Sequence, residues 1–347
     1  MYLMDPKAEG WTLGELTTLI GGKLDGPADF RVTRPVRADS VDPQGIAFAE
    51  KQSYVDAATG VGALVVSEDI DVRGKPAIRV TQPRFAFARI LHLAHRPIPI
   101  MEGIHPSAQI DSRAWVDRSA SIGPFVIIER HARIGPRAEV HAGAYIGDSC
   151  EVGAETIIYP GAVLVQDVRV GARCILHANC VLGADGFGFV WDGKQRVKVP
   201  QVGGVVLGDD VEVGAGTCID RSTCGETVIG DGTKLDNMVQ IAHNVTLGTA
   251  VAIAAHSSVA GSSHIGDRVV MGGQSGVADH LSVAADSMLG GRAGVLQSLD
   301  EPGSYLGFPA QDSRDAIRQM HALKELPALL KRVRVLEAQI SQMEKKD

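Results

Sequence analysis

The most regular feature of the sequence is an apolar side chain at every sixth position through the middle of the chain. The repeat starts at Ile104, breaks off after Leu182, resumes at Leu207, and slips by four residues between Ile219 and Ile229. Its three runs are Ile104, Ile110, Val116, Ile122, Ile128, Ile134, Val140, Ile146, Val152, Ile158, Leu164, Val170, Leu176 and Leu182; Leu207, Val213 and Ile219; and Ile229, Leu235, Ile241, Leu247, Ile253, Val259, Ile265, Met271, Val277, Val283, Leu289 and Val295. We predict a parallel β-helix, a triangular prism in which each hexad supplies one short strand and one corner. Three hexads make a coil of about 18 residues, and the repeat makes roughly ten coils.

A second position of each hexad, four residues after the apolar one, holds smaller side chains. Cys150, Cys174 and Cys180 fall at this position, so we expect them to be buried core filler rather than reactive groups. The chain has five cysteines, an odd number, with no C-x-x-C pair. Neither a zinc knuckle nor a disulfide framework is therefore predicted.

The chain follows other patterns on either side of the prism. Residues 1–103 contain helical patterns over 12–24 and 84–95 and strand-like runs over 63–67 and 77–81, which predict a separate α/β domain. Residues 104–306 form the prism, interrupted at 183–206 by a polar, glycine-rich insertion. Residues 307–347 predict C-terminal helices with a short coiled coil, from the spacing of Leu326, Leu329, Val333, Leu336, Ile340 and Met343. The predicted fold is thus mainly β, a left-handed parallel β-helix with an α/β domain before it and a helical tail after it.

Composition agrees with a prism closed by small and aliphatic side chains. The 347 residues include 40 glycines but only 8 Phe, 5 Tyr and 3 Trp, and glycine suits the tight corners. The formal net charge of −7 argues against nucleic acid or an anionic membrane surface as the main partner. The sequence offers no apolar run of about 20 residues and no secretory start, so we expect a cytoplasmic protein without a membrane span.

Candidate chemistry lies in the third run, where His243 follows Asp236 by seven residues. One coil beyond His243 the prism reaches Gly261, and the next coil ends beside His280. Because neighbouring strands lie about 4.8 Å apart, these residues should form a column about 10 Å long. Such a column can place a general base beside a backbone N–H that binds an oxyanion. A structural role for His243 is the alternative, and the spacing of the histidines does not suit a metal site.

Several motifs together resemble a known family. They are the prism with its preceding α/β domain, GADGFGF at 183–189, DNMVQIAHNV at 236–245, GVADHLSV at 276–283 and EPG at 301–303. The combination is similar to the UDP-3-O-acylglucosamine N-acyltransferases of lipid A biosynthesis, over essentially the whole chain. The hexapeptide repeat alone is shared with many acyltransferases, whereas the combination is specific.

The resemblance implies a reaction and roles for four residues. A 3-hydroxyacyl chain would pass from the phosphopantetheine thioester of acyl carrier protein to the 2-amino group of UDP-3-O-(3-hydroxyacyl)glucosamine, by direct attack of the amine and without a cofactor or metal. His243 matches the general base and Asp236 the carboxylate that orients it. Gly261 matches the oxyanion donor, and His280 the second active-site histidine.

The resemblance also implies substrate contacts. In the N-terminal domain the uracil would stack between Phe48 and Tyr54. Lys51 stands where a polar uracil contact, often Asn, is expected, and His256 stands where the family more often has Gly or Gln. Four further residues of the family motifs are substrate-binding candidates: Asn237, Gln240, Phe187 and Phe189.

Two more groups of residues are assigned to the donor side of the reaction. Gly294 and Leu296 are expected where the acyl groove ends, although the acyl chain length and the linkage at the sugar 3-position stay open. The basic C-terminal quarter could dock the acidic carrier protein, with Arg292, Arg314 and Arg318 as candidates. A solvated helix face is the alternative for these arginines.

The oligomeric state and two other functions complete the hypotheses. The heptad pattern taken alone favours a dimer, but three flat prism faces favour a homotrimer, and we predict a trimer with sites between subunits. One alternative function is a coenzyme A-dependent acyltransferase acting on another nucleotide sugar. The other is a non-catalytic β-helix.

Overall fold

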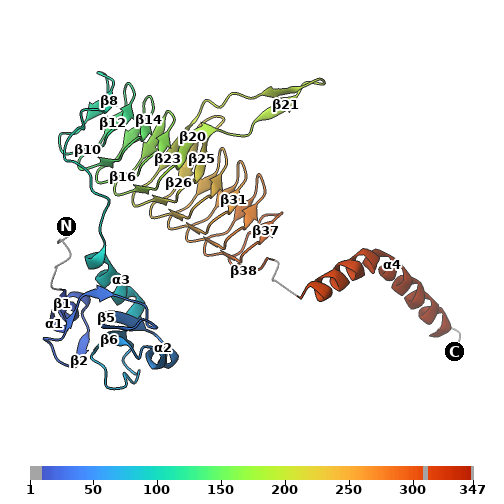
Figure 1. Cartoon of the computed structure of the whole chain (residues 1–347). Helices are drawn as coiled ribbons and strands as arrows, with labels where there is room; N and C mark the ends of the chain where they lie inside the picture. Colours follow the sequence, from blue (N-terminus) through green and yellow to red (C-terminus); the bar gives the residue numbers. More distant parts are fainter. Residues whose placement is uncertain (1–9, 308–311, 345–347) are drawn as a thin grey trace. The chain divides into compact units, whose positions relative to one another are not determined.

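The structure is a computed structural model that describes residues 10–307 and 312–344. Residues 1–9 of the predicted N-terminal domain and residues 308–311 and 345–347 of the predicted C-terminal segment lie outside the described residues. The chain divides into two compact units, Met1–Pro99 and Ile100–Asp347 (Figure 1). This division falls four residues before the boundary predicted at 103. Each unit is described by itself below.

The N-terminal unit is a five-stranded sheet covered by helices, with strand order β2-β7-β6-β5-β4. Its strands and helices are β1 (Trp11–Thr12), α1 (Leu13–Ile20), β2 (Lys23–Asp25), β3 (Arg31–Val32), β4 (Arg34–Pro35), β5 (Asp42–Ala49), α2 (Gln52–Ala57), β6 (Val61–Val66), β7 (Ala77–Arg79) and α3 (Pro83–Ala94). One apolar cluster on the sheet includes Leu16 of α1 and Ile90 of α3, and a second includes Val55 of α2. The predicted helices and strands are present, although the helix predicted over 12–24 ends at Ile20 and residues 23–25 form the strand β2. The elements β1, β3, β4, β5 and α2 were not predicted.

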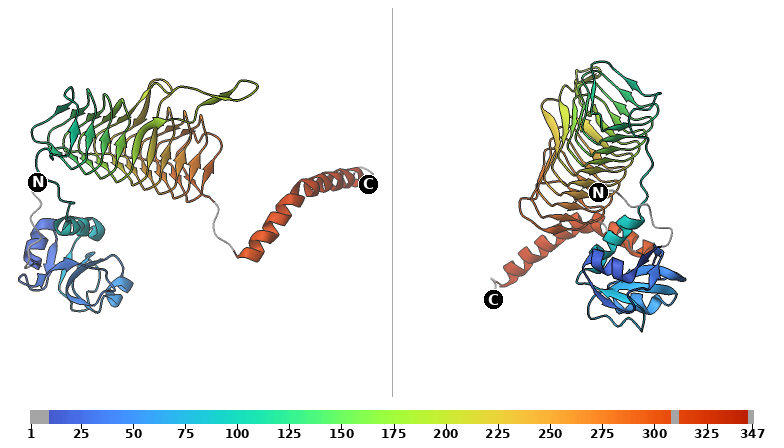
Figure 2. Two further views of the ribbon diagram at one scale, coloured as in Figure 1. Left: turned by 45° about the horizontal axis from the view of Figure 1, so that its top comes forward. Right: turned by 90° about the vertical axis from the view of Figure 1, so that its left-hand side faces the viewer.

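The second unit contains the predicted left-handed parallel β-helix, and the hexads account for its strands. Three parallel sheets form the three faces of the prism, with ten, nine and ten strands (Figures 1 and 2). We number the faces in chain order.

The strands of each face follow one another at intervals of one coil. Face 1 holds β8 (Gln109–Ile110), β11 (Ile127–Ile128), β14 (Tyr145–Ile146), β17 (Val163–Leu164), β20 (Val181–Asp185), β25 (Cys218–Arg221), β28 (Gln240–Ile241), β31 (Ser258–Val259), β34 (Gly276–Val277) and β37 (Gly294–Val295). Face 2 holds β9 (Trp115–Val116), β12 (Arg133–Ile134), β15 (Glu151–Val152), β18 (Val168–Val170), β23 (Gly204–Leu207), β26 (Glu226–Ile229), β29 (Thr246–Leu247), β32 (His264–Ile265) and β35 (Ser282–Val283). Face 3 holds β10 (Ser121–Ile122), β13 (Glu139–Val140), β16 (Ile157–Ile158), β19 (Ile175–Leu176), β24 (Glu212–Val213), β27 (Lys234–Leu235), β30 (Ala252–Ile253), β33 (Val270–Met271), β36 (Met288–Leu289) and β38 (Ser304–Tyr305).

The prism core consists of the stacked aliphatic side chains together with the small residues of the second hexad position. Ile146, Leu164 and Leu182 on face 1 are completely buried. Cys150 and Cys180 are also buried, and burial raises the pKa of the Cys150 thiol to about 11 and that of Cys180 to about 12. These thiols stay protonated near neutral pH, which confirms that they fill the core rather than react.

Two residues turn the chain at the regular corners of the prism, and at most corners from Phe125 onward the second of them has a positive φ. Non-glycine residues occupy this left-handed conformation at many corners, including Asn244 with a φ of 62° and Ala250 with a φ of 53°. The first corner residue has its N–H outside the strand ladder. Asp or Asn side chains of the next coil cap several of these amides, as Asp267 caps Thr249 at 2.7 Å.

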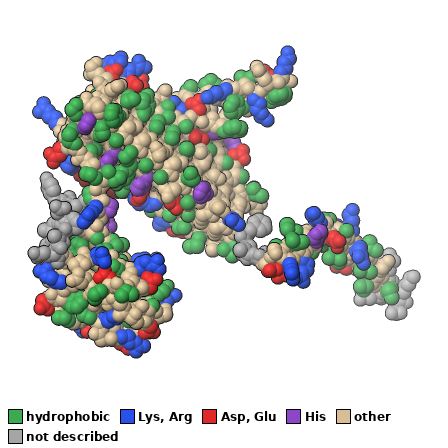
Figure 3. All heavy atoms as spheres, viewed as in Figure 1, with side chains coloured by type: hydrophobic (Ala, Val, Ile, Leu, Met, Phe, Trp, Pro, Cys, Tyr) green, Lys and Arg blue, Asp and Glu red, His purple; other side chains and the backbone are tan. Residues whose placement is uncertain are grey.

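The insertion leaves the prism as a hairpin of β21 (Phe189–Trp191) and β22 (Arg196–Lys198), which pair antiparallel. Figure 3 shows cationic and hydrophobic side chains side by side on this extension. The chain re-enters the prism at β23, which begins at Gly204, and the apolar hexad position resumes at Leu207.

The C-terminal segment forms one helix, α4 (Ser313–Glu344), where several helices were predicted. Pro327 lies inside it, although proline usually ends or kinks a helix. The side chains of the predicted heptad seam are exposed, and they are Leu326, Leu329, Val333, Leu336, Ile340 and Met343. Among the described residues no helix is both long and apolar enough to cross a membrane.

Candidate active site

The imidazole of His243 lies between two glycines from different parts of the chain. His243 is the first corner residue after β28, between faces 1 and 2. A Cβ added to Gly261, one coil further on, would lie 2.7 Å from Cε1 and 2.8 Å from Nε2 of His243. A Cβ added to Gly186, in the insertion, would lie 2.7 Å from Cδ2 of the same ring. Only glycine at both positions leaves room for this ring orientation.

Backbone hydrogen bonds connect the three coils that carry the predicted column. Ser262 N–H donates to the carbonyl of His243 at 3.0 Å, and His280 N–H donates to the carbonyl of Gly261 at 3.0 Å. His280 is exposed at the next corner. Within the described parts of the chain, the Gly261 N–H has no hydrogen-bond acceptor. The structure therefore brings His243, Gly261 and His280 together and leaves one backbone donor free beside the imidazole.

A pocket of about 490 Å³ opens beside this column on face 1. The insertion contributes Phe187 and Phe189, whose rings meet edge to face with centroids 5.2 Å apart. The prism wall contributes Gln240, Ser258 and Asp220. The pocket thus brings together three of the predicted substrate-binding residues, and Gly186, which lies against the His243 ring, also lines it.

Asp220 is the carboxylate whose charge interacts with His243 within the chain. Burial raises the pKa of Asp220, as does the nearby charge of Asp185, while a hydrogen bond from Gln240 and the interaction with His243 lower it. Asp220 follows the inward Ile219 on β25, at the point where the hexad register slips. Asp185 is itself paired with Lys198 of the hairpin.

Asp236 has a structural role in its own chain. It follows β27 at the corner between faces 3 and 1, whereas His243 lies at the corner between faces 1 and 2. Its carboxylate accepts the N–H of Asn237 at 2.7 Å and that of Ala255 at 3.1 Å. A seven-residue separation carries the chain past one corner of the prism, so the two side chains do not meet on one edge. A contact with His243 would require another copy of the chain.

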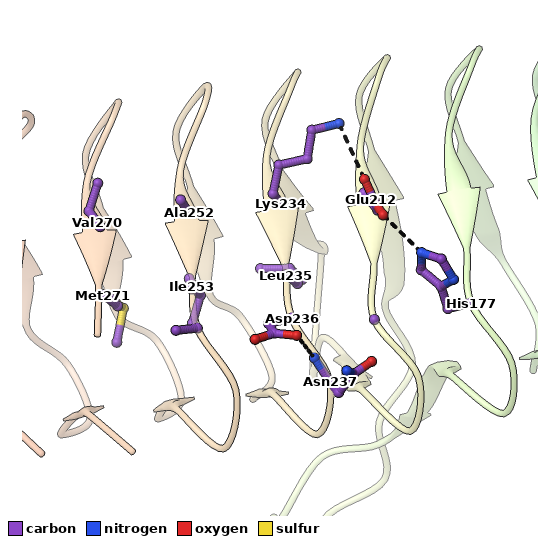
Figure 4. Close-up of a pocket in the computed structure, with 12 residues that line it drawn as sticks. His177, Glu212, Lys234, Leu235, Asp236, Asn237, Ala252, Ile253, Val270 and Met271 are labelled. Atoms are coloured by element: carbon purple, nitrogen blue, oxygen red, sulfur yellow. Dashed lines mark hydrogen bonds and ion pairs between the residues drawn. The ribbon is translucent and has the colours of Figure 1, made fainter. Parts of the chain in front are cut away.

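Asp236 and Asn237 instead line a second pocket, of about 660 Å³, on face 3 (Figure 4). Along this face His177 Nε2 lies 2.8 Å from Glu212 Oε1, and Lys234 Nζ lies 4.0 Å from the other oxygen of Glu212. Sequence reasoning had not singled out these three side chains. The predicted site residues of the prism are therefore divided between two faces.

The N-terminal candidates have different surroundings. Phe48 on β5 packs against the apolar cluster that includes α1 and α3, and its ring centroid lies 5.1 Å from that of Phe87. Tyr54 on α2 is half exposed, and Lys51 is the exposed residue that precedes this helix. Phe48 thus contributes to the core of the domain, and the uracil-stacking role of the pair stays a prediction.

The donor-side candidates lie at the end of the prism and on α4. Gly294 and Leu296 line a pocket of about 550 Å³ at the last coils. Arg292 donates from Nε to Gln274 at 2.7 Å, and Arg318 pairs with Asp315 at 2.5 Å. Arg314 is exposed on α4, and the docking role of the three arginines stays a prediction. His256 is an exposed corner residue with a φ of 59°.

Three residues near His243 were missed by sequence reasoning. Gly186 lies inside the GADGFGF motif and Asn244 inside DNMVQIAHNV, so both motifs pointed to the right region without distinguishing these positions. Asp220 lies beside the four-residue slip in the hexad register, and this irregularity was the one feature of the sequence that could have pointed to it. No cluster of three or more His, Cys, Asp and Glu side chains suited to a metal ion occurs in the described residues.

The prism and its histidine column define a hexapeptide-repeat acyltransferase. The family described as Bacterial transferase hexapeptide (six repeats) matches residues 149–184, and the hexapeptide repeat of succinyl-transferase matches residues 125–160. A UDP-3-O-acylglucosamine N-acyltransferase of Pseudomonas savastanoi pv. phaseolicola is 40% identical over 330 residues, which are 94% of this chain and 94% of that protein. One of the same name from Anaeromyxobacter dehalogenans is 41% identical over 283 residues, 74% of this chain and 75% of that protein. The chain belongs to the UDP-3-O-acylglucosamine N-acyltransferase family.

The chain is also similar to a solved structure, that of the UDP-N-acetylglucosamine O-acyltransferase of Moraxella catarrhalis. It is 27% identical, with a TM-score of 0.45, and the match covers 56% of this chain and 67% of that one.

Proposed function

We propose that this acyltransferase moves a 3-hydroxyacyl chain from the thioester of acyl carrier protein to the 2-amino group of a UDP-3-O-acylglucosamine, a step of lipid A biosynthesis. The observation that carries the proposal is the His243 imidazole fixed between Gly186 and Gly261 at the edge of the face 1 pocket. The free N–H of Gly261 beside it supplies the second group that acyl transfer needs.

The residues of the column account for each step of the reaction. The amine nitrogen attacks the thioester carbonyl carbon, a C–N bond forms, and Nε2 of His243 takes a proton from the nitrogen. The carbonyl oxygen becomes an oxyanion, which accepts a hydrogen bond from the Gly261 N–H. The C–S bond then breaks, and the protonated His243 returns the proton to the departing thiolate. No acyl-enzyme and no cofactor take part, and His280 lines the next coil of the column.

A row of aligned positions on face 1, which we call the small-residue track, is an argument for the acyl groove. It begins at Gln240 and continues through the small residues Ser258, Gly276 and Gly294. Gln240 of the pocket pairs with Ser258, Ser258 with Gly276, and Gly276 with Gly294 on successive strands. Three strand spacings of about 4.8 Å give the track a length of roughly 14 Å. The acyl chain would start at the His243 column, lie along these positions, and end at the pocket of Gly294 and Leu296.

The division of the site residues between two faces supports a homotrimer. In the proposed assembly, the face 3 pocket of one copy, with Asp236 and Asn237, closes against the face 1 pocket of the next copy, with His243 and Gln240. Each site would then contain all of the predicted prism residues. The uridine would be held by Phe48, Tyr54 and Lys51, and the carrier protein by the basic side chains Arg292, Arg314 and Arg318.

Product analysis with three sets of substrates tests the substrate assignment. The protein is incubated with 3-hydroxyacyl carrier protein and UDP-3-O-acylglucosamine, with acetyl-coenzyme A and a different UDP-amino sugar, or with each donor and no sugar. An amide product in the first reaction alone supports the proposal. Turnover of acetyl-coenzyme A on another nucleotide sugar would support the coenzyme A-dependent alternative, and no acyl transfer to any acceptor would support a non-catalytic β-helix.

A further inference from the structure

The four-residue slip in the hexad register forms a short loop beside the His243 corner. The loop, Ser222–Gly225, joins β25 to β26 and precedes the coil of His243. It is anchored at its start by Arg221, a buried side chain whose Nε donates to the Gly203 carbonyl at 2.8 Å. Thr223 Oγ1 donates to Gln201 at 2.9 Å, which connects the loop to the end of the insertion. A regular hexad corner would have no residues to make these contacts.

The slip loop surrounds the side-chain amide of Asn244. Asn244 Nδ2 donates to the Cys224 carbonyl at 3.0 Å and to the hydroxyl of Ser222. The Ser222 hydroxyl in turn donates to the Cys224 carbonyl at 2.6 Å, so its oxygen is free to accept from Nδ2. On the other side, Thr223 N–H donates to Asn244 Oδ1 at 3.1 Å. Both ends of the amide have partners of the correct kind, which fixes its orientation.

The fixed amide determines which nitrogen of His243 carries the proton. Asn244 Oδ1 also lies 3.1 Å from Nδ1 of His243. Because Oδ1 can only accept, the neutral imidazole forms this hydrogen bond only when Nδ1 is the protonated nitrogen. Nε2, on the Gly261 side of the ring, is then left with its lone pair. This is the nitrogen that must take the proton from the attacking amine.

We infer that Asn244, held by the slip loop Ser222–Gly225, is the positioning residue that sets the tautomer and ring orientation of His243. The inference rests on the proposed function in one respect, the role of His243 as the base. It gives Asn244 of the same chain the orienting task that the resemblance assigned to Asp236, and it leaves Asp236 of a neighbouring copy to stabilise the positive charge that His243 gains. The four extra residues of the slip loop thereby have a catalytic role, because they supply the hydrogen-bond partners of the Asn244 side-chain amide.

Two substitutions at Asn244 and one elsewhere test this role. Asn244→Ala removes the acceptor, and alanine fits the corner because Ala250 adopts a similar φ of 53° at another corner. Asn244→Asp keeps an acceptor facing Nδ1. Asn179→Ala is the matched control, since Asn179 is also a corner residue, with a φ of 60°, and lies beside Gly161 rather than the His243 column.

The main readout is the tautomer, measured on the full-length protein labelled with 15N-histidine at about pH 8 by solid-state NMR. The His243 signals are assigned by their loss in His243→Gln. We expect the wild type, Asn244→Asp and Asn179→Ala to hold the Nδ1-protonated form, and Asn244→Ala to gain the Nε2-protonated form. An unchanged His243 spectrum in Asn244→Ala would overturn the inference.

The second readout is kcat/KM of the acyl transfer. We expect a loss of about tenfold or more in Asn244→Ala, partial recovery in Asn244→Asp, and no change in Asn179→Ala. Equal losses in Asn244→Ala and Asn244→Asp, with the wild-type tautomer in both, would indicate a purely structural role and contradict the inference. Failure of the proposed function is a separate result. Full activity in His243→Ala would show that His243 is not the base, whatever the NMR spectra of the Asn244 variants show.

Discussion

At the scale of single residues, the account depends on how closely the chain confines the His243 ring. Stepping through the sequence by one coil predicted that His243 and Gly261 lie in one column, and the structure brings them together. Asp236 lies at the preceding corner of its own chain, so its place beside His243 of another copy stays a prediction. Gly186 and Asp220 could not be predicted, because both reach the site through irregular segments whose path no repeat describes.

The fit of His243 against Gly261 gives the first prediction. A methyl group in Gly261→Ala would lie within 2.8 Å of two ring atoms, so the imidazole must move. A displacement of about 1 Å at a catalytic group can cost about 100-fold in rate, and we expect a loss of this order in kcat/KM. Gly273→Ala is the matched control, since Gly273 is also a first corner residue but has its nearest neighbour at 3.4 Å. Equal activities of the two variants would refute the role of this contact.

The surroundings of Asp220 give a prediction about stability and pH. Burial raises the pKa of Asp220 above its value in the unfolded chain, so the folded state holds this proton to a higher pH. The free energy of unfolding therefore falls as the pH rises from the pKa of Asp220 in the unfolded chain to its pKa in the folded protein. Above the folded pKa it falls no further on account of this group. Asparagine cannot ionise, so Asp220→Asn should be more stable than the wild type at pH 8 and equal to it near pH 3. Urea unfolding at both pH values measures this, and a variant less stable at pH 8 would contradict it.

At the scale of elements, the hexads predicted the three faces of the prism almost completely, because a single period fixes both the strand and its inward side chain. The N-terminal domain was predicted less well. β5 and α2 were missed, since neither shows a clear period. The ring of Phe48 packs against Phe87, and no pattern in the sequence indicated that contact. The helical pattern after the prism was recognised, but Pro327 did not end α4 as proline often does.

The small-residue track on face 1 gives a prediction about chain length. No atom lies within 4 Å of a Cβ added to Gly294, so Gly294→Leu should fold normally while filling the far end of the track. We expect the variant to lose activity with long acyl chains, by about tenfold or more, and to keep it with chains a few carbons shorter. Competition among carriers of mixed chain length, analysed by mass spectrometry, measures the preference. Gly291→Leu is the control, since Gly291 lies at the corner before β37, off the track, with its nearest neighbour at 3.5 Å; an identical shift in both variants would exclude the track.

At the scale of the whole molecule, the account requires more than one copy of the chain. Asp236 and His243 lie on different edges of one prism, so a site that uses both must form between copies. The exposed apolar seam of α4 offers a further surface for association. The sequence suggested a trimer from the three faces of the prism, but it could not show that the site residues divide between two of them.

Mixing two inactive variants tests the shared site. His243→Ala and Asp236→Asn each disable every site of a uniform trimer, whereas a mixed trimer contains one site with both natural residues. We therefore expect co-expression of the two variants to restore up to about a third of the wild-type activity, in a particle with the mass of three chains. Light scattering and the acyl-transfer assay provide the measurements. No recovery in verified mixed trimers would contradict a site built from Asp236 of one copy and His243 of another.

The central claim is that His243 is the base for direct attack of the sugar amine on the thioester. The most direct measurement is the rate of amide formation under single-turnover conditions, by mass spectrometry, for the wild type and His243→Ala. The account predicts a loss of between about 100-fold and 10,000-fold in His243→Ala, with binding of the sugar nucleotide retained and no acylated protein at any time. An undiminished rate in His243→Ala, or an acyl group attached to the protein during turnover, would contradict it.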